Sequence, residues 1–226
     1  MYKNGLKRVF DFCCAFLALV VLSPFLVLFM IIGAVAMGGN PFFTQPRPGK
    51  DEKIFKLIKF RTMSNAKDKD GNLLPDDQRL NSYGKFLRST SVDELPELIN
   101  ILKGDMAVIG PRPQLVRDMV FMNDEQRKRH TVRPGLSGLA QVNGRNVITW
   151  EDKLAWDLKY IEKITFIVDV KIIFETIGKV FKRADINREG TASDMDFGDY
   201  LLQKGAVSKE EYDKKQVEAK KLLIRG

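Results

Sequence analysis

The sequence predicts an α/β protein, mostly helical with one small β-hairpin, in which a membrane-inserted segment precedes a compact cytosolic domain. Three observations predict it: a long uncharged apolar run near the N-terminus, one stretch of strand-like alternation, and several amphipathic stretches after it. We expect three parts. Residues 1–40 form the membrane segment, residues 41–188 the cytosolic domain with amphipathic helices at the membrane interface, and residues 189–226 a tail that ends in a charged helix.

The apolar run, residues 12–37, carries no charged residue and is long enough to span a bilayer as a helix. Ser23 and Pro24 interrupt it. Proline lacks an N–H and its ring clashes with the carbonyl four residues earlier, while a serine hydroxyl can bond the carbonyl that is freed. Lysines and arginines flank both ends, and such residues stay on the cytoplasmic side. We therefore favour a re-entrant helix–break–helix hairpin, broken at Ser23 and Pro24, over a kinked helix that spans the membrane.

Residues 41–63 predict a β-hairpin, because a turn-rich segment separates two apolar strands. In the second strand, Lys59 and Arg61 share a face, where they could contact a phosphate or remain solvated. Residues 64–79 are polar, contain Gly and Pro, and predict a surface loop.

Two adjacent acids stand in "STSVDELPELINILKGDMAVIGPRP", residues 89–113. Either Ser91 opens a helix with a capping box, or Pro96 is the first helical residue. In both cases Asp93 and Glu94 lie at a helix N-terminus, where the helix dipole stabilises negative charge. Gly104 is the expected end of this helix.

The remaining stretches predict further helices and loops. His130 is the single histidine, so a histidine-based triad or metal site is not expected, and we interpret it as structural. The expected segments are an amphipathic helix at 114–130, a structured loop at 131–146, helices at 150–163 and 169–184, a loop at 185–205 and a solvated helix after Ser208.

The net charge of +8 favours anionic partners. Ordinary capping and ion pairing would explain the acids alone. Phosphate chemistry would explain them together with Arg88 and Arg112, because a carboxylate that approaches a diphosphate needs nearby positive charge. Mg²⁺ commonly binds one or two carboxylates together with substrate phosphates, which suits Asp93 and Glu94.

An ordered set of motifs carries a family resemblance. The motifs are "FTQPRPG", "IFKLIKFRTM", "LRSTSVDELPELINILKGDMAVIGPRP", "VRPGLSGLAQVNGRN" and "DVKII". With the apolar segment, this set closely resembles the bacterial monotopic phosphoglycosyl transferases over residues 1–188. The compact size resembles the member that begins N-linked glycan assembly with a bacillosamine-type sugar.

The resemblance implies an enzyme that transfers a phospho-sugar from a UDP-sugar to undecaprenyl phosphate and releases UMP, through a covalent aspartyl-phosphosugar and with Mg²⁺. It implies Asp93 as nucleophile and metal neighbour, and Glu94 as the residue that positions or deprotonates the acceptor phosphate. Arg112 and Arg88 match family arginines. The residues expected to bind substrate or phosphate are Lys59, Arg61, Arg88, Arg112, Gln141, Arg145 and Asp157.

The resemblance also implies a location and partners. We expect a protein of the bacterial inner (cytoplasmic) membrane, inserted from one side, with its active site on the cytoplasmic face. Expected partners are membrane lipids and downstream glycosyltransferases, and not nucleic acid. UDP-N,N′-diacetylbacillosamine is the favoured donor, with UDP-GlcNAc, UDP-GalNAc and UDP-galactose as alternatives. Two other functions remain open: a basic membrane-bound adaptor for lipid or nucleic acid, and a phosphatase that forms an aspartyl-phosphate.

Overall fold

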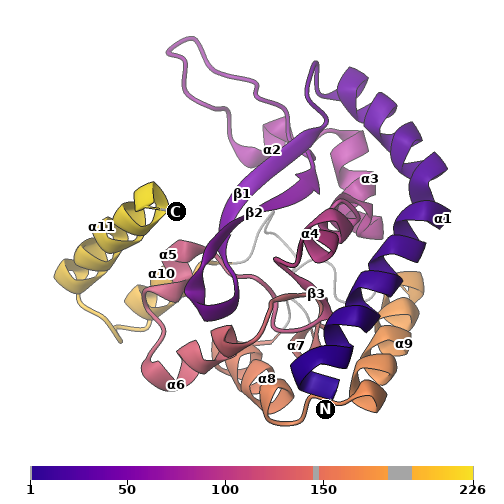
Figure 1. Cartoon of the computed structure of the whole chain (residues 1–226). Coiled ribbons are helices and arrows are strands. Elements are labelled where there is room, and N and C mark those ends of the chain that lie inside the picture. The colour runs from indigo at the N-terminus through magenta and orange to yellow at the C-terminus, as the bar shows by residue number, and fades with distance from the viewer. Residues whose placement is uncertain (1, 145–147, 183–194, 226) are drawn as a thin grey trace.

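The computed structural model describes residues 2–144, 148–182 and 195–225 (Figure 1). A bent helix, α1, lies on one side of the molecule, a hairpin and short helices form the centre, and α10 and α11 lie on the opposite side. The bounds of the first half are η1 Tyr2–Leu6, α1 Lys7–Ala36, β1 Phe42–Pro48, η2 Lys50–Glu52, β2 Ile54–Phe60, α2 Asp76–Arg79, α3 Ser82–Thr90, η3 Val92–Glu94, α4 Glu97–Lys103 and β3 Ala107–Ile109. Those of the second half are α5 Val116–Met119, α6 Asp124–Arg127, η4 Lys128–Thr131, β4 Gly135–Ser137, α7 Leu139–Val142, α8 Trp150–Glu162, α9 Phe166–Lys182, α10 Phe197–Gln203 and α11 Lys209–Arg225.

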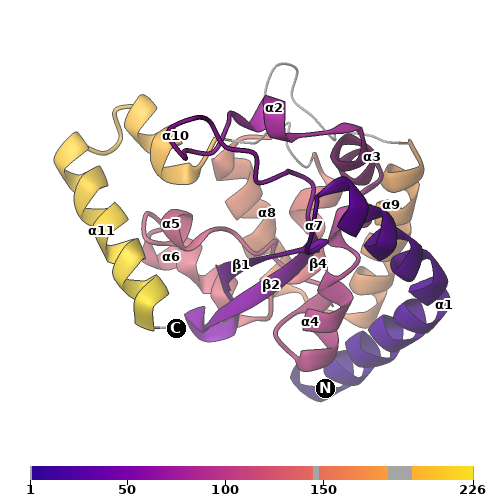
Figure 2. The same ribbon diagram turned by 90° about the horizontal axis from the view of Figure 1, so that it is seen from above.

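Helix α1 is the one described helix that is long and apolar enough to cross a membrane. The predicted break between two helices is not seen, since the helix continues through Pro24. The physical reason is the neighbouring hydroxyl: Ser23 Oγ donates to the carbonyl of Val20 at 2.8 Å, which is the carbonyl that loses its partner because Pro24 has no N–H. Figures 1 and 2 both show α1 changing direction along its length, so the pair bends the helix instead of breaking it.

Both ends of α1 are attached to the same domain. Near its start, Arg8 donates to the carbonyls of Ile101 at 2.6 Å and Leu102 at 2.8 Å, at the C-terminal end of α4. Beyond the bend, Tyr83 of α3 donates to the carbonyl of Phe29 at 2.8 Å. Asn81, the residue before α3, donates to the carbonyl of Ala36 at 3.2 Å. The helix therefore leaves the domain and returns to it.

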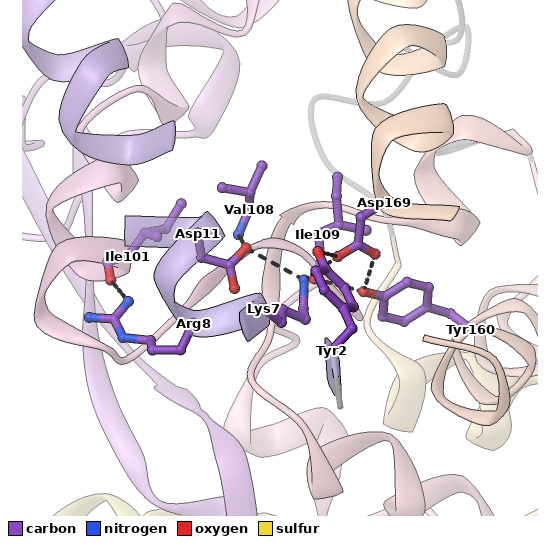
Figure 3. A network of polar contacts seen from close by, with 9 residues as sticks. All are labelled: Tyr2, Lys7, Arg8, Asp11, Ile101, Val108, Ile109, Tyr160 and Asp169. Carbon is purple, nitrogen blue, oxygen red and sulfur yellow. Dashed lines mark hydrogen bonds and ion pairs between the residues drawn. The ribbon is translucent and has the colours of Figure 1, made fainter. Parts of the chain in front are cut away.

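A buried polar network fixes the start of α1 against α9 (Figure 3). Asp169 is 0% exposed and accepts hydrogen bonds from Tyr2 at 2.8 Å, Lys7 at 2.6 Å and Tyr160 at 2.8 Å. Lys7 also pairs with Asp11 at 3.4 Å, whose carboxylate accepts the backbone N–H of Val108. One lysine thus serves two buried aspartates, one on each helix, and each charge has a partner.

The predicted hairpin is confirmed, with β1 and β2 antiparallel and Phe42 opposite Phe60. The side chain of Asn100, 1% exposed, holds this hairpin against α4. Its Oδ1 accepts the N–H of Ile58 at 3.0 Å, and its Nδ2 donates to the carbonyl of Lys56 at 2.8 Å. The contact places β2 directly beside the segment that carries Asp93 and Glu94.

A second sheet, which the sequence did not predict, pairs β3 and β4 in parallel. Two glycines allow it: a Cβ added at Gly135 would lie 2.1 Å from the backbone nitrogen of Gly110. No other residue type fits such an approach without backbone movement. The contact joins the "IGPRP" and "VRPGLSG" segments, which are separate in the sequence.

Four predicted segments are wrong in detail. The expected loop at 64–79 contains α2, and the expected loop at 131–146 contains β4 and α7 within its described part. The expected helix at 114–130 is divided into α5, α6 and η4, because the side chain of Asn123 accepts the N–H of Gln126 and starts a new helix there. The expected loop at 185–205 contains α10 within its described part, residues 195–205. Ser208 caps α11 as predicted, since its Oγ accepts the N–H of Glu211.

The tail is packed against the domain, so the terminal helix that was predicted to be solvated is solvated on one face only. Phe197 of α10 is 3% exposed and Ala219 of α11 is 2% exposed, and both belong to a core shared with α5 and α8. Lys215 also donates to the carbonyl of Val120 at 2.8 Å. Tyr212, Ala219 and Leu222 of α11 pack on this core, while most lysines and glutamates of the helix remain exposed.

Candidate active site

The two acids lie in a short 3₁₀ turn between α3 and α4. Helix α3 ends at Ser91, whose φ of 56° is left-handed, and η3 follows at once. The capping-box prediction for Ser91 is wrong, because its side chain makes no capping hydrogen bond. The alternative is close to the observed structure: Pro96 is the N-cap of α4, and Asp93 and Glu94 come just before it.

Glu94 is held between two cations. Its Oε1 accepts from Lys59 at 2.9 Å and from Arg112 at 2.6 Å. Burial alone would raise the pKa of Glu94, but the attraction of Arg112 and Lys59 outweighs burial and lowers it well below the ordinary value. Glu94 is therefore a fixed anion that orients both cations, and it is a weak base.

Asp93 has the opposite environment. Among the residues that the structure describes, none donates a hydrogen bond to its carboxylate or forms an ion pair with it. Burial and the neighbouring charge of Glu94 raise the pKa of Asp93 to about 6, against the pull of Lys59, Arg112 and Arg88. Two adjacent carboxylates are thus driven apart in pKa, as expected of a site with two roles.

Glu97 is a site residue that the sequence reasoning missed. It is 2% exposed, and its Oε1 lies 3.1 Å from the Nζ of Lys59. Burial, with the charge of Glu94, raises the pKa of Glu97 to about 7, although Lys59 opposes this. The available signal was its spacing three residues after Glu94, which places the two side chains near each other at a helix start. Lys59 therefore bridges two carboxylates.

The backbone carbonyl of Arg112 is held in place by a buried ion pair between Arg129 and Asp157. Arg129, 2% exposed, donates to the carbonyl of Arg112 at 2.6 Å and twice to Oδ2 of Asp157, at 2.9 and 2.6 Å. Asp157 is also 2% exposed. Its carboxylate faces Arg129, so this geometry favours a supporting function for Asp157 over the direct substrate contact that the sequence suggested.

The other residues that were expected to bind substrate differ in how they relate to the two acids. Arg88 donates to Thr62 at 3.1 Å and is close enough to lower the pKa of Asp93. Gln141 lines a cavity that Glu94 also lines, and among the described residues its buried Oε1 has no hydrogen-bond partner. Arg61 follows β2 and joins none of the ion pairs found in the described ranges. Arg145 lies outside the described residues.

His130 is 5% exposed, and burial together with Arg129 lowers its pKa to about 3. It is therefore neutral at physiological pH and is enclosed behind the site, as a structural residue would be.

The acids of this site are compatible with Mg²⁺. Glu94 and Glu97 already pair with Lys59, and Glu94 also pairs with Arg112, whereas the Asp93 carboxylate has no ion-pair partner among the described residues. The described ranges hold no group of three or more His, Cys, Asp or Glu side chains suited to a metal. A cation at Asp93 would therefore draw further ligands from substrate phosphates, which is how Mg²⁺ is usually held at phosphate sites.

The chain matches the family model described as bacterial sugar transferase over residues 2–183. It is 43% identical over 175 residues to the uncharacterized sugar transferase EpsL of Bacillus subtilis, covering 77% of this chain and 87% of that protein. It is 38% identical to UDP-glucose:undecaprenyl-phosphate glucose-1-phosphate transferase of Klebsiella pneumoniae and 32% identical to undecaprenyl-phosphate galactose phosphotransferase of Salmonella typhimurium. The alignments with these two cover 79% of this chain but only 41% of each relative. The chain therefore belongs to the bacterial sugar transferase family and is a sugar-phosphate transferase.

Proposed function

We propose that this enzyme transfers a sugar phosphate from a UDP-sugar to undecaprenyl phosphate, releasing UMP and forming undecaprenyl-diphospho-sugar. One observation carries the proposal: Glu94 is neutralised by Lys59 and Arg112, whereas the adjacent Asp93 carboxylate is unpaired within the described structure. The site thus combines an available nucleophile with fixed positive charge. The names of the Klebsiella and Salmonella relatives describe the same class of reaction.

The proposed reaction has two displacements at one phosphorus atom. An Asp93 oxygen attacks the phosphorus that carries the sugar, the bond to the bridging oxygen breaks, and UMP leaves with that oxygen. An oxygen of the acceptor phosphate then attacks the same phosphorus, and the Asp93 carboxylate leaves. Each step forms one P–O bond and breaks one.

The cations of the site have a defined task in this scheme. Arg112 and Lys59 reduce the repulsion between an anionic nucleophile and an anionic diphosphate, and Glu94 keeps both in place. The lowered pKa of Glu94 favours this positioning function over removal of a proton from the acceptor. Mg²⁺ bound at Asp93 and the diphosphate would further neutralise the developing charge.

We also propose that the protein inserts into the bacterial inner membrane from the cytoplasmic side, and that α1 dips into one leaflet and returns. The support is that Arg8, near the start of α1, and Ala36, at its end, both contact one domain. Three residues of α1 are buried, Asp11, Ala15 and Gly33, and the exposed side chains of the helix are mostly apolar. Beside α1, helix α9 exposes Phe166, Ile167 and Phe174, a face suited to the membrane interface.

The donor sugar is a separate part of the proposal. The sequence resemblance favours UDP-N,N′-diacetylbacillosamine, and the proposed place of the reaction is the first membrane step of glycoconjugate assembly, before other glycosyltransferases act. The relatives' names mention galactose and glucose. A donor panel must therefore hold these two sugars as well as the acetamido sugars.

The test is UMP release by purified protein with Mg²⁺, undecaprenyl phosphate and each UDP-sugar, with Asp93→Asn as the matched variant. We expect UMP with one donor, and an intact mass increased by one phospho-sugar when the acceptor is omitted. Asp93→Asn should lose both signals while keeping its thermal unfolding midpoint.

The same assay separates the other candidate functions. A phosphatase would release phosphate or sugar phosphate without needing the acceptor. An adaptor would bind lipid equally well in wild-type and Asp93→Asn protein and release no UMP with any donor. Either result would contradict the proposed transfer.

A further inference from the structure

An apolar cavity of about 230 Å³ lies between the segment of the two acids and helix α9. Thr90, Ser91 and Glu94 line it from the side of the acids, and Ile173, Ile177 and Val180 line it from α9. The strands β3 and β4 contribute further apolar wall. The cavity therefore begins beside Glu94, the neighbour of Asp93 in the sequence, and extends from there to α9.

The wall of the cavity is unsuited to a nucleotide or a phosphate. Its exposed surface is almost entirely apolar, and its described cation, Lys179, stands on α9 and not among the acids. A hydrated group transferred there would lose water without gaining equivalent hydrogen bonds. A hydrocarbon chain would gain from the same transfer.

The cavity also reaches the apolar outer face of the protein. Ile177 lines the cavity and is still 46% exposed, on the helix whose exposed face carries Phe166, Ile167 and Phe174. This helix runs beside α1 (Figures 1 and 2). A chain bound in the cavity could thus continue into lipid without crossing polar surface.

We propose that this cavity binds the first isoprene units of the polyprenyl phosphate acceptor, with the phosphate outside the cavity, beside Lys59 and Arg112, the two cations that pair with Glu94. The inference rests on the proposed function and adds to it the part of the protein that recognises the acceptor. It predicts that narrowing the cavity weakens acceptor use and leaves the first displacement intact.

The test uses two cavity-filling variants, Ile177→Trp and Val180→Phe. The matched control is Lys171→Trp, on the same helix, where the native side chain is 73% exposed and not part of the cavity wall. Two acceptors are compared: undecaprenyl phosphate and a short analogue with two isoprene units. Adduct formation on Asp93 is also measured in every variant with the donor and without an acceptor. This step requires folded protein and bound donor, so it shows whether either has been lost.

We expect both cavity variants to raise the acceptor KM at least fivefold for the long and the short acceptor, with adduct formation unchanged, and the control to match wild type within twofold. A raised KM for the UDP-sugar, or slower adduct formation in variants that keep the wild-type unfolding midpoint, would assign the cavity to the donor. Unchanged use of the two-isoprene acceptor would also overturn the inference. Wild-type protein that forms neither adduct nor UMP would overturn the proposed function, and this inference with it.

Discussion

At the scale of single residues, the site depends on the unequal environments of two neighbouring carboxylates. Adjacent residues in a 3₁₀ turn point in different directions, so Glu94 meets Lys59 and Arg112 while Asp93 meets no partner among the described residues. The charges of Arg112 and Lys59 stabilise the anion of Glu94. Burial and the negative charge of Glu94 destabilise the anion of Asp93. In the proposed mechanism, this difference gives Glu94 a positioning function and leaves Asp93 available to attack phosphorus.

This difference predicts the pH dependence of the first displacement. The attacking form of Asp93 is ionised, and its pKa is raised to about 6, so the rate of adduct formation should fall as pH decreases through about 6. Because Arg88 lowers this pKa, Arg88→Gln should move the acidic limb to higher pH. Rapid-quench measurement of UMP between pH 5 and 8 gives the pH at which the rate falls to half, and this midpoint does not depend on the maximal rate.

Lys85→Gln provides the control, because Lys85 is an exposed residue of the same helix α3. A limb near pH 4 in wild-type protein, or one that Arg88→Gln does not move, would contradict this account of Asp93.

At the scale of elements, the "IGPRP" segment is positioned by helix α8 through the side chain of Asp157, which faces Arg129. Asp157 of α8 neutralises Arg129, and Arg129 bonds the carbonyl of Arg112. The contacts thus link Asp157 of α8, through Arg129, to the backbone of Arg112, whose guanidinium donates to Glu94. Both charges are almost fully buried, so each depends on the other.

We expect Asp157→Asn to destabilise the protein by about 3 kcal/mol or more, since breaking a buried pair leaves Arg129 without a counter-charge. The rate of adduct formation should fall as well, because the carbonyl of Arg112 loses its fixed partner. Denaturant unfolding and single-turnover kinetics measure the two effects. Glu162→Gln, at an exposed position of α8, is the control and should change neither; an Asp157→Asn protein of wild-type stability would show that the pair is dispensable.

At the scale of the whole molecule, three groups of contacts hold one domain together. Helix α1 is attached at both of its ends, the two sheets bring the site segments together, and α10 with α11 closes a core on the side away from α1 (Figure 1). The molecule thus has an apolar side, formed by α1 and α9, and a charged side, formed by α11. This division is what a protein held at a membrane surface requires.

The attachment of both ends of α1 predicts a labelling pattern. With Cys13 and Cys14 replaced by alanine, single cysteines at Gly5 and Asn40 should react with an impermeant reagent from the same side of the membrane. The cytosolic reference is Lys214→Cys on α11, which is exposed. Inside-out vesicles should expose all three sites and intact spheroplasts none. Labelling of Gly5 and Asn40 from opposite sides would contradict the re-entrant proposal.

The docked tail predicts a stability effect outside the region that matches the family. Ala219→Asp should lower the free energy of unfolding by about 3 kcal/mol, because it places an unpaired charge in a packed core. Lys220→Asp, at the neighbouring exposed position, should have little effect. Urea unfolding of the two variants makes the comparison, and equal midpoints would mean that α11 does not contribute to the core.

The sequence by itself determined the features that short stretches carry. The uncharged run, the Ser23–Pro24 pair, the alternation of the hairpin and the adjacent acids Asp93 and Glu94 are all local patterns, and hydrophobic periodicity and turn chemistry act locally.

Only the tertiary structure decided how residues distant in sequence meet. It brought Lys59 to both Glu94 and Glu97, brought Arg112 to Glu94, directed Asp157 toward Arg129, and paired β3 with β4 through Gly110 and Gly135. It also turned a charged terminal stretch into a packed helix. No local pattern encodes these contacts, because each depends on which surfaces are left to be buried once the elements have formed.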